Sequence, residues 1–186
     1  MLCSTFAVVL VVALGTALVG AFPREALKKT CSLSKYRFPA PSELVAVQKM
    51  KEQFEDTMLL TDRKCSTRLF HRRWTTAELT VPDRVILVEA ELDFVIAVLG
   101  QPTAHKLAET HQQALAFLTQ AREDLQGCVA AEAPSHQPSG KLRHWLQKLE
   151  TAKKTESAGC LEGSAILYLF QVLNDLRCAA QRQHCT

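Results

Sequence analysis

The stretch RVILVEAELDFVIAVLGQP, residues 84–102, decides the fold class of this 186-residue chain. From Arg84 to Leu99, sixteen residues are apolar nearly all round and contain no turn signal. Strands rarely run that long, so the length outweighs the β-branched residues and favours a helix buried in the core. The sequence Gly100-Gln101-Pro102 then ends that helix.

Helical periodicity continues on both sides of this stretch. Upstream, a helix over about 41–61 is expected to begin at Pro41, because proline suits the first helical position. Downstream, over about 103–128, a second helix has an apolar stripe at three- and four-residue steps, made by Leu107, His111, Ala114, Leu115, Leu118, Ala121, Leu125 and Cys128. A short amphipathic helix is predicted over 141–151, and a last helix from Cys160 to Cys178. The sequence shows no strand pattern or repeat, so the predicted class is all-α.

Connection lengths predict how the helices are ordered in space. About three residues join the two middle helices, which makes them antiparallel neighbours. The first and third connections are each about 20–30 residues long, enough to cross the bundle before the next helix begins. The expected architecture is an up-up-down-down four-helix bundle with extra short helices.

The N-terminus is typical of a signal peptide, over 1–21. Its apolar run from Phe6 to Val19 has fourteen residues, whereas a membrane span takes about 20. The small residues Gly20 and Ala21 follow the run, as at a cleavage site. A membrane anchor is the alternative. We therefore predict secretion, with residues 22–186 as a single helical domain whose first part, 22–40, is an extended lead-in.

Six cysteines remain once the signal peptide, which holds Cys3, is removed. An even number in a secreted chain predicts three disulfides. In the expected topology only Cys65 and Cys160 lie at the end where the first long helix finishes, so they should pair. At the other end, the short separation favours pairing of Cys178 with Cys185. The favoured set is Cys31–Cys128, Cys65–Cys160 and Cys178–Cys185.

Catalytic and metal-binding motifs are missing from the sequence. It has no G-x-S-x-G, no H-E-x-x-H and no glycine-rich phosphate loop. His105 and His111 are six residues apart, on different sides of a helix, so they do not make a zinc pair. His111 lies in the core stripe and is predicted to be a hydrogen-bonded structural residue. We expect no enzyme activity, no cofactor and no metal.

Two segments concentrate positive charge in a chain whose net charge is +3. In the first, Phe70 and Trp74 stand beside three arginines, Arg68, Arg72 and Arg73. In the second, over 141–154, Glu150 stands against five cations, Lys141, Arg143, Lys148, Lys153 and Lys154. Such segments form a solvated surface, contact a partner's acidic surface or bind extracellular polyanions. Aromatic residues among arginines can also bind nucleic acid, but a secreted chain argues against that partner.

The last helix has more apolar surface than a core stripe needs. At about 100° per residue, one arc holds the expected core residues Ala165, Ile166, Leu169, Val172, Leu173 and Leu176. Phe170 lies at the edge of this arc, and Leu167 lies on the polar side with Gln171 and Asn174. An isolated exposed leucine is ordinary, but Leu167 beside Phe170 suggests a binding surface.

Several stretches together resemble the type III interferons (interferon lambda), helical cytokines related to the interleukin-10 group. They cover the mature chain in the family's order and are Pro41-x-Glu43-Leu44, Met58-Leu59-Leu60, Cys65-x-x-Arg68-Leu69-Phe70, Val88 to Leu92, Gly140 to Leu146, Lys153-Lys154, Ala158 to Glu162 and Leu169-Phe170. Two positions depart from the family: Arg63 stands where some members have a further cysteine, and Leu167 where phenylalanine is frequent. The family's disulfide pattern agrees with the pairing favoured above.

The resemblance implies a secreted, monomeric antiviral cytokine. Such proteins bridge a specific interferon-lambda receptor chain and the shared interleukin-10 receptor beta chain, which activates JAK-STAT signalling. By position in the family, the residues expected to contact the specific receptor chain are Pro41, Leu44, Lys49, Lys51, Leu167 and Phe170. Two other interpretations stay open: an interleukin-10-like factor, usually an intertwined dimer, and a basic host-defence protein that binds heparin or membranes.

Overall fold

The computed structural model describes residues 31–58, 65, 68–100, 109–132 and 134–185. The helices in these ranges are α2 (Pro41–Met58), α3 (Val81–Leu99), α4 (Glu109–Glu132), α5 (Gly140–Thr155), α6 (Ala158–Leu167) and α7 (Leu169–Gln181). Short 3-10 helices are η1 (Ser34–Arg37), η2 (Thr76–Glu78) and η3 (Arg182–His184). The same ranges hold no strand, which confirms the all-α class. The predicted signal peptide and the predicted helix ends at 59–61 and 103–108 lie outside them.

Helix α3 lies at the centre of the fold, as its all-round apolar sequence predicted. Leu87, Val88, Leu92, Phe94 and Val95 point in several directions from the helix axis, and all are fully buried. They can be buried together because α3 packs against α4, α5, α6 and α7. Removing this apolar surface from water is the main stabilising contribution to the bundle.

Local chemistry sets the two ends of α3. The Thr80 side chain accepts a hydrogen bond from the backbone N–H of Asp83 at 3.4 Å and so caps the first turn, close to Pro82. At the other end, a Cβ on Gly100 would lie 2.7 Å from the carbonyl oxygen of Ile96. Glycine therefore permits the tight exit from the helix.

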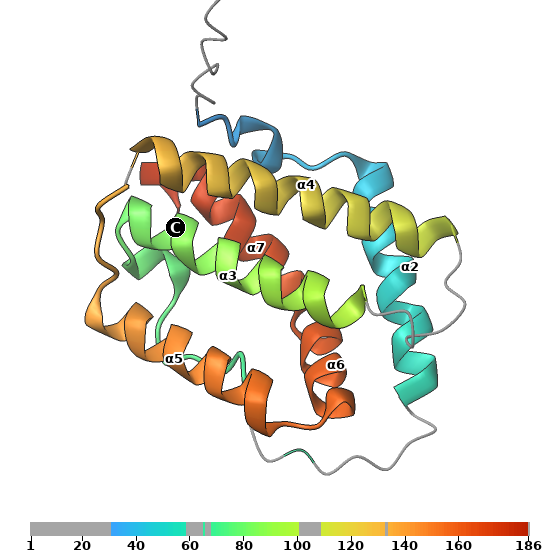
Figure 1. Ribbon diagram of the computed structural model, residues 1–186. Helices are drawn as coiled ribbons and strands as arrows, with labels where there is room; N and C mark the ends of the chain where they lie inside the picture. The colour runs from blue at the N-terminus through green and yellow to red at the C-terminus, as the bar shows by residue number, and fades with distance from the viewer. Residues whose placement is uncertain (1–30, 59–64, 66–67, 101–108, 133, 186) are drawn as a thin grey trace, which may run out of the picture.

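The helix order follows the prediction from connection lengths. Figure 1 shows α3 and α4 side by side and running in opposite directions. Helix α3 runs toward the side of the bundle where α2 lies, and α4 and α7 run back along it. The three disulfides join Cys31 to Cys128, Cys65 to Cys160 and Cys178 to Cys185, which is the pairing that the helix order favoured. The fold is therefore an all-helical bundle with three disulfides.

The prediction of one continuous helix from Cys160 to Cys178 is wrong, because Tyr168 interrupts it. Tyr168 has φ −101° and ψ 4°, and it separates α6 from α7, which Figure 1 shows at an angle to each other. Its ring stacks on Phe70 with the centroids 5.3 Å apart and 22° between the planes. Gly163 and Ser164, in the turn before, are weak helix formers. The stacking contact and the weak turn together account for the break.

The interpretation of 22–40 as an extended lead-in is also wrong over its described part. Residues 34–37 form η1, and Tyr36 is buried. The Tyr36 hydroxyl donates to Asp124 of α4 at 2.8 Å, and Arg37 Nε donates to the carbonyl oxygen of Ala180 at 3.0 Å. Together with the Cys31–Cys128 disulfide, these bonds fold the segment onto α4 and α7.

Candidate functional site

Apolar surface reaches solvent at the break between α6 and α7. Leu167, the last residue of α6, is 60% exposed. Phe170, in the first turn of α7, is half-buried and packs partly against the core. The residues of the predicted core arc, Ala165, Ile166, Leu169, Val172, Leu173 and Leu176, are all buried. The break therefore preserves the core arc, with Phe170 at its edge and Leu167 outside it.

The four expected receptor residues of α2 lie on two different faces of that helix. Leu44 and Lys51 are half-buried, and at about 100° per residue they lie within about 20° of each other. Pro41, exposed at the start of the helix, lies about 60° from Leu44. Lys49 is exposed and lies about 140° from Leu44 and about 160° from Lys51, so it is on a different face from these two, and Pro41 is about 80° from each lysine. The Lys51 ammonium group forms an ion pair with Glu55, one turn further along.

The neighbours of α2 show which way the Leu44 edge faces. Helix α2 packs against α4 and α6. Glu43 lines a pocket with Phe117 and Gln120 of α4, so the Glu43 edge faces α4. Leu44 is the next residue and lies about 100° round the helix, on the edge toward α6. Leu44 and Lys51 are therefore on the same side of the bundle as α6, which ends at Leu167, whereas Pro41, about 180° from buried Met50, faces outward.

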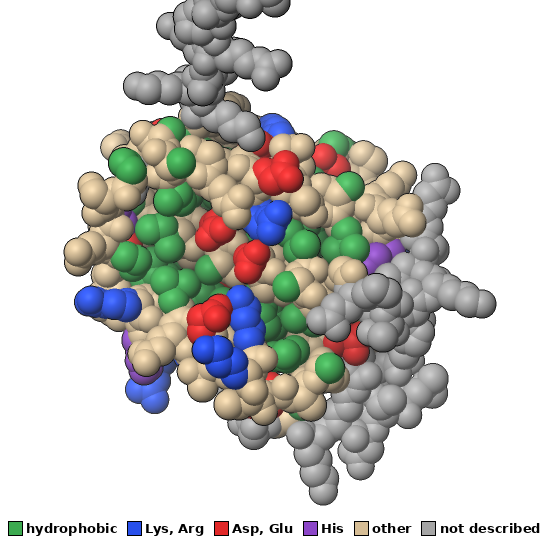
Figure 2. Space-filling view, viewed as in Figure 1, with side chains coloured by type: hydrophobic (Ala, Val, Ile, Leu, Met, Phe, Trp, Pro, Cys, Tyr) green, Lys and Arg blue, Asp and Glu red, His purple; other side chains and the backbone are tan. Residues whose placement is uncertain are grey.

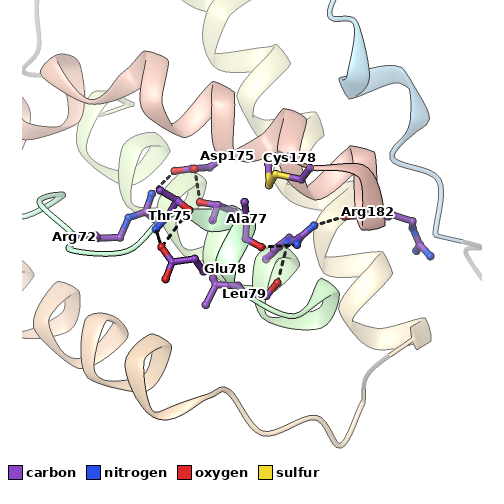
Figure 3. The surroundings of a disulfide bond; sticks show 11 residues. Arg72, Thr75, Ala77, Glu78, Leu79, Asp175, Cys178 and Arg182 are labelled. Carbon is purple, nitrogen blue, oxygen red and sulfur yellow. Dashed lines mark hydrogen bonds and ion pairs between the residues drawn. A yellow bond between two sulfur atoms is a disulfide. The ribbon is translucent and has the colours of Figure 1, made fainter.

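A buried ion cluster lies next to this break, and the sequence analysis missed it. The side chain of Arg72 is only 4% exposed. Its Nη1 lies 3.0 Å from Oε1 of Glu91 on α3, and its Nη2 donates to Oδ2 of Asp175 on α7. The Thr76 hydroxyl donates to the other oxygen of Asp175. Figure 3 shows Arg72 reaching across to Asp175 on α7. The cluster fixes the segment before η2 to two helices.

The placement of Arg72 corrects the prediction of a basic surface over 68–73. The guanidinium carbon of Arg72 lies 4.8 Å from the ring centre of Trp74 and 5.8 Å from that of Trp145, so cation–π contacts add to the ion pairs. Arg68 and Arg73 are exposed, but Arg72 is part of the interior. Glu91, a charged residue on an otherwise apolar face of α3, was the one available signal of a buried cation.

Burial raises the pKa of the Glu91 carboxyl well above its ordinary value. The nearby Asp175 carboxylate raises this pKa further, while the Arg72 guanidinium opposes the shift. Two carboxyl groups share one guanidinium, so a proton on Glu91 makes the cluster neutral. Low dielectric favours that neutral state.

Arg72, Thr76 and Asp175 of the cluster line a surface pocket of about 270 Å³. The segment 70–76 makes one wall, and Tyr168 and Gln171, at the α6–α7 break, make the other. Arg72 and Asp175 therefore share a pocket with Tyr168, the residue that follows Leu167 in the chain.

A second buried arginine fastens the chain next to this pocket. The guanidinium of Arg84 on α3 donates to the carbonyl oxygens of Ala77 at 2.8 Å, Leu79 at 3.0 Å and Arg182. Figure 3 shows these bonds beside the disulfide of Cys178. They hold η2 against the C-terminal end of α7.

The histidine prediction is confirmed. His111 is 1% exposed, and its Nε2 lies 3.1 Å from the carbonyl oxygen of Leu99. Burial lowers the pKa of this imidazole, which keeps it neutral as part of the core. In the described ranges, no group of three His, Cys, Asp or Glu side chains is arranged to hold a metal ion.

Comparison with known proteins places this arrangement in a family. The family model described as Interleukin-28A matches residues 28–182. Interferon lambda-3 from Gallus gallus is 71% identical over 186 residues, all of both chains. The chain belongs to the interferon lambda family. Interferon lambda-1 from Homo sapiens is 32% identical over 183 residues, 96% of this chain and 92% of that protein. Interferon lambda-2 from Mus musculus is 34% identical over 160 residues, 84% of this chain and 83% of that protein.

Family membership assigns the class of protein. Members of the interferon lambda family are cytokines and not enzymes, so this chain is a cytokine. Within the described ranges, none of the helices combines the length and the apolar character that crossing a bilayer needs.

Proposed function

We propose that this interferon lambda is a secreted antiviral cytokine that bridges a specific interferon-lambda receptor chain and the interleukin-10 receptor beta chain, and so starts JAK-STAT signalling. Family membership supports the cytokine class. The observation that carries the receptor proposal is Leu167, exposed to 60% at a defined point of the fold, with Phe170 half-buried beside it.

The specific receptor chain would dock across α2 and the α6–α7 break. Leu167 and Phe170 are its apolar anchors, Leu44 and Lys51 extend the surface along the α6 side of α2, and Pro41 lies at its outer edge. Lys49, on the outer face of α2, lies at the margin of this surface. Interfaces of this kind concentrate their binding energy in a few apolar or aromatic anchors surrounded by polar contacts.

The fold holds these anchors in place before binding. The Cys65–Cys160 disulfide fixes the start of α6, and Tyr168, stacked on Phe70, fixes the break. A surface that is already ordered loses less conformational entropy when it binds. The mechanism is therefore association alone: one rigid monomer brings two receptor chains together, and no bond is made or broken.

Binding of the folded, disulfide-bonded mature chain to the two purified receptor ectodomains tests the proposal. We expect it to bind the specific receptor chain alone and to recruit the beta chain into a ternary complex. Phe38→Ala supplies a control for truncation of Leu167. Phe38 is larger than Leu167 and 87% exposed, but it lies on the α4 side of α2, so its truncation should leave contact with the specific receptor chain unchanged. A folded protein that binds neither ectodomain would contradict the proposal.

Solution mass separates this function from that of an interleukin-10-like factor. We expect the mass of a single chain by light scattering at micromolar concentration. An intertwined dimer would place the chain with the dimeric cytokines and would contradict the monomer that we propose.

A further inference from the structure

Two basic segments that lie far apart in the sequence meet on one face of the molecule. Lys148 Nζ on α5 donates to the carbonyl oxygen of Arg68 at 2.8 Å. Lys141 Nζ donates to the carbonyl oxygen of Glu78 at 3.4 Å and lies 5.8 Å from the ring centre of Trp74. The segment 68–78 therefore runs along α5 and adds its exposed cations, Arg68 and Arg73, to those of the helix.

The phase of α5 arranges its own cations in two rows. Leu142, Trp145, Leu149 and Ala152 are buried and define the inner side. Lys141 and Lys148 lie within about 20° of each other on the flank next to the segment 68–78. Arg143 and Lys154 also lie within about 20° of each other, on the outer side of the helix. From Lys141 to Lys154 the rows extend about 20 Å along the axis.

A shallow groove of about 340 Å³ lies between the two rows. Its polar lining is His144, Gln147, Lys148, Thr151 and Thr155, which supply N–H and O–H donors. Figure 2 shows Lys, Arg and His side chains gathered along the α5 edge of the molecule. The face therefore offers both positive charge and hydrogen-bond donors to a long anionic ligand.

Few of these charges are neutralised within the protein. Lys153 lies 2.8 Å from Glu150 and 3.7 Å from Asp93, and Lys141 lies 3.5 Å from Glu78. Within the part of the chain that the structure describes, the cations of this face without an ion pair are Arg68, Arg73, Arg143, Lys148 and Lys154. Partial burial also lowers the pKa of Lys148, so an anion beside it would relieve the cost of its charge.

We propose that this α5 basic face, made of Arg68, Arg73, Lys141, Arg143, Lys148 and Lys154, binds a sulfated glycosaminoglycan chain. The ligand class follows from the shape and charge of the face, because two rows of cations along an open groove match an extended polyanion with repeated sulfate groups. The inference rests on the secretion included in the proposed function, since such chains are extracellular. The α5 basic face would then be a second binding surface of the cytokine, and binding to extracellular glycosaminoglycans would hold the protein near cells.

Nucleic acids and membranes fit the same face less well. Single strands bind through exposed aromatic rings on which bases stack, but Phe70 is buried and Trp74 is half-buried against Arg72. A membrane-surface helix needs an outward apolar side, whereas α5 turns Leu142, Trp145 and Leu149 inward.

Affinity for immobilised heparin as a function of salt tests the proposal directly. The folded mature chain should remain bound at about 0.15 M NaCl. The double variant Arg143→Glu/Lys154→Glu should lower the slope of log affinity against log salt by about 2, roughly one for each cation removed from a polyanion contact. The matched control, Lys49→Glu/Arg177→Glu, makes the same change in net charge at two exposed residues away from α5 and should leave the slope unchanged.

Competition distinguishes the possible ligands. Soluble heparan sulfate or chondroitin sulfate should displace the protein from heparin, and unsulfated hyaluronan should not. Equal loss of heparin binding in the two double variants would show a general effect of net charge and overturn the site. Stronger competition by single-stranded DNA or by phosphatidylserine vesicles would overturn the ligand class.

The Arg143→Glu/Lys154→Glu variant should bind the specific receptor ectodomain normally, so failure of the glycosaminoglycan site and failure of the receptor proposal give different results.

Discussion

Arg72 lines the same pocket as Tyr168, and Leu167 precedes Tyr168 in the chain; each of the two reverses the usual preference of its residue type. The side chain of Arg72 is 4% exposed, whereas Leu167 is 60% exposed. The buried charge is compensated inside the protein by Glu91 and Asp175. The exposed leucine has no such compensation within the described part of the fold. The buried charge of Arg72 is paired within the protein and serves stability, whereas the exposed Leu167 marks the surface where we propose that a partner binds.

Removing the buried cation is expected to have the largest effect. Arg72→Met leaves two carboxyl groups in the interior without their guanidinium, and should cost about 3–5 kcal/mol of unfolding free energy. Arg72→Lys keeps the positive charge but loses the planar guanidinium that reaches Glu91 and Asp175 at once. Its loss of unfolding free energy should be smaller than that of Arg72→Met. Urea denaturation with the disulfides intact measures both. A loss below about 1 kcal/mol for Arg72→Met would show that the guanidinium does not compensate the two buried carboxyl groups.

Truncating Phe170 and Leu167 should show which of the two apolar side chains packs against the core. Phe170→Ala should lower the unfolding free energy by about 1–2 kcal/mol, below the 3–5 of a fully buried phenylalanine, because half of the side chain packs on the core. Leu167→Ala should change it by less than about 0.5 kcal/mol. Thermal melting of the two variants measures the difference. Equal losses would mean that Leu167 also packs in the core.

Glu91→Gln should stabilise the protein, by about 1 kcal/mol near neutral pH, since the natural folded chain must keep a proton on Glu91 that the unfolded state has released, whereas glutamine is neutral at every pH. The folded-state pKa of Glu91 is raised, so the folded state binds this proton more tightly than the unfolded state does. Its contribution to stability is complete below the unfolded pKa of about 4.3 and declines as the pH rises through the folded value.

The advantage of Glu91→Gln over the natural chain should therefore grow as the pH rises above about 4. Denaturation at a series of pH values measures it, with Glu89→Gln as the control, because Glu89 is only half-buried on α3. A constant difference at every pH would contradict the raised pKa.

The smallest effect is expected from a cation at the surface. Lys153 contacts Glu150 and Asp93, but its side chain is 28% exposed and solvent screens the pairs. Lys153→Ala should cost about 0–1 kcal/mol, far less than Arg72→Met. Denaturation in low and high salt measures the loss. A loss as large as that of Arg72→Met would contradict the claim that the buried charge contributes more to stability than the exposed one.

Much of the fold was predictable because its signals are local or depend on chain length. The apolar sequence over 84–99 indicated the central helix, and connection lengths gave the helix order and so the disulfide pairs. The position of His111 in an apolar stripe indicated a core histidine. Each of these inferences needs only periodicity or geometry along the chain.

The features near the candidate site were harder to predict because they depend on contacts between distant residues. The break at Tyr168 depends on a ring 98 positions earlier, Phe70. Arg72 is buried because Glu91 and Asp175 from two other helices reach it, and no spacing along the sequence records that. The exposure of Leu167 was predictable from helix phase, and its receptor role stays a prediction.

The most direct test of the account is the dissociation constant of Leu167→Ala for the specific receptor ectodomain, measured beside its melting temperature. We predict binding at least about tenfold weaker, equal to about 1.4 kcal/mol, with the melting temperature unchanged. Leu167→Phe, which introduces the residue frequent in the family, should bind at least as tightly as the natural chain. A folded Leu167→Ala variant that binds as tightly as the natural chain would contradict the claim that the receptor docks at the α6–α7 break.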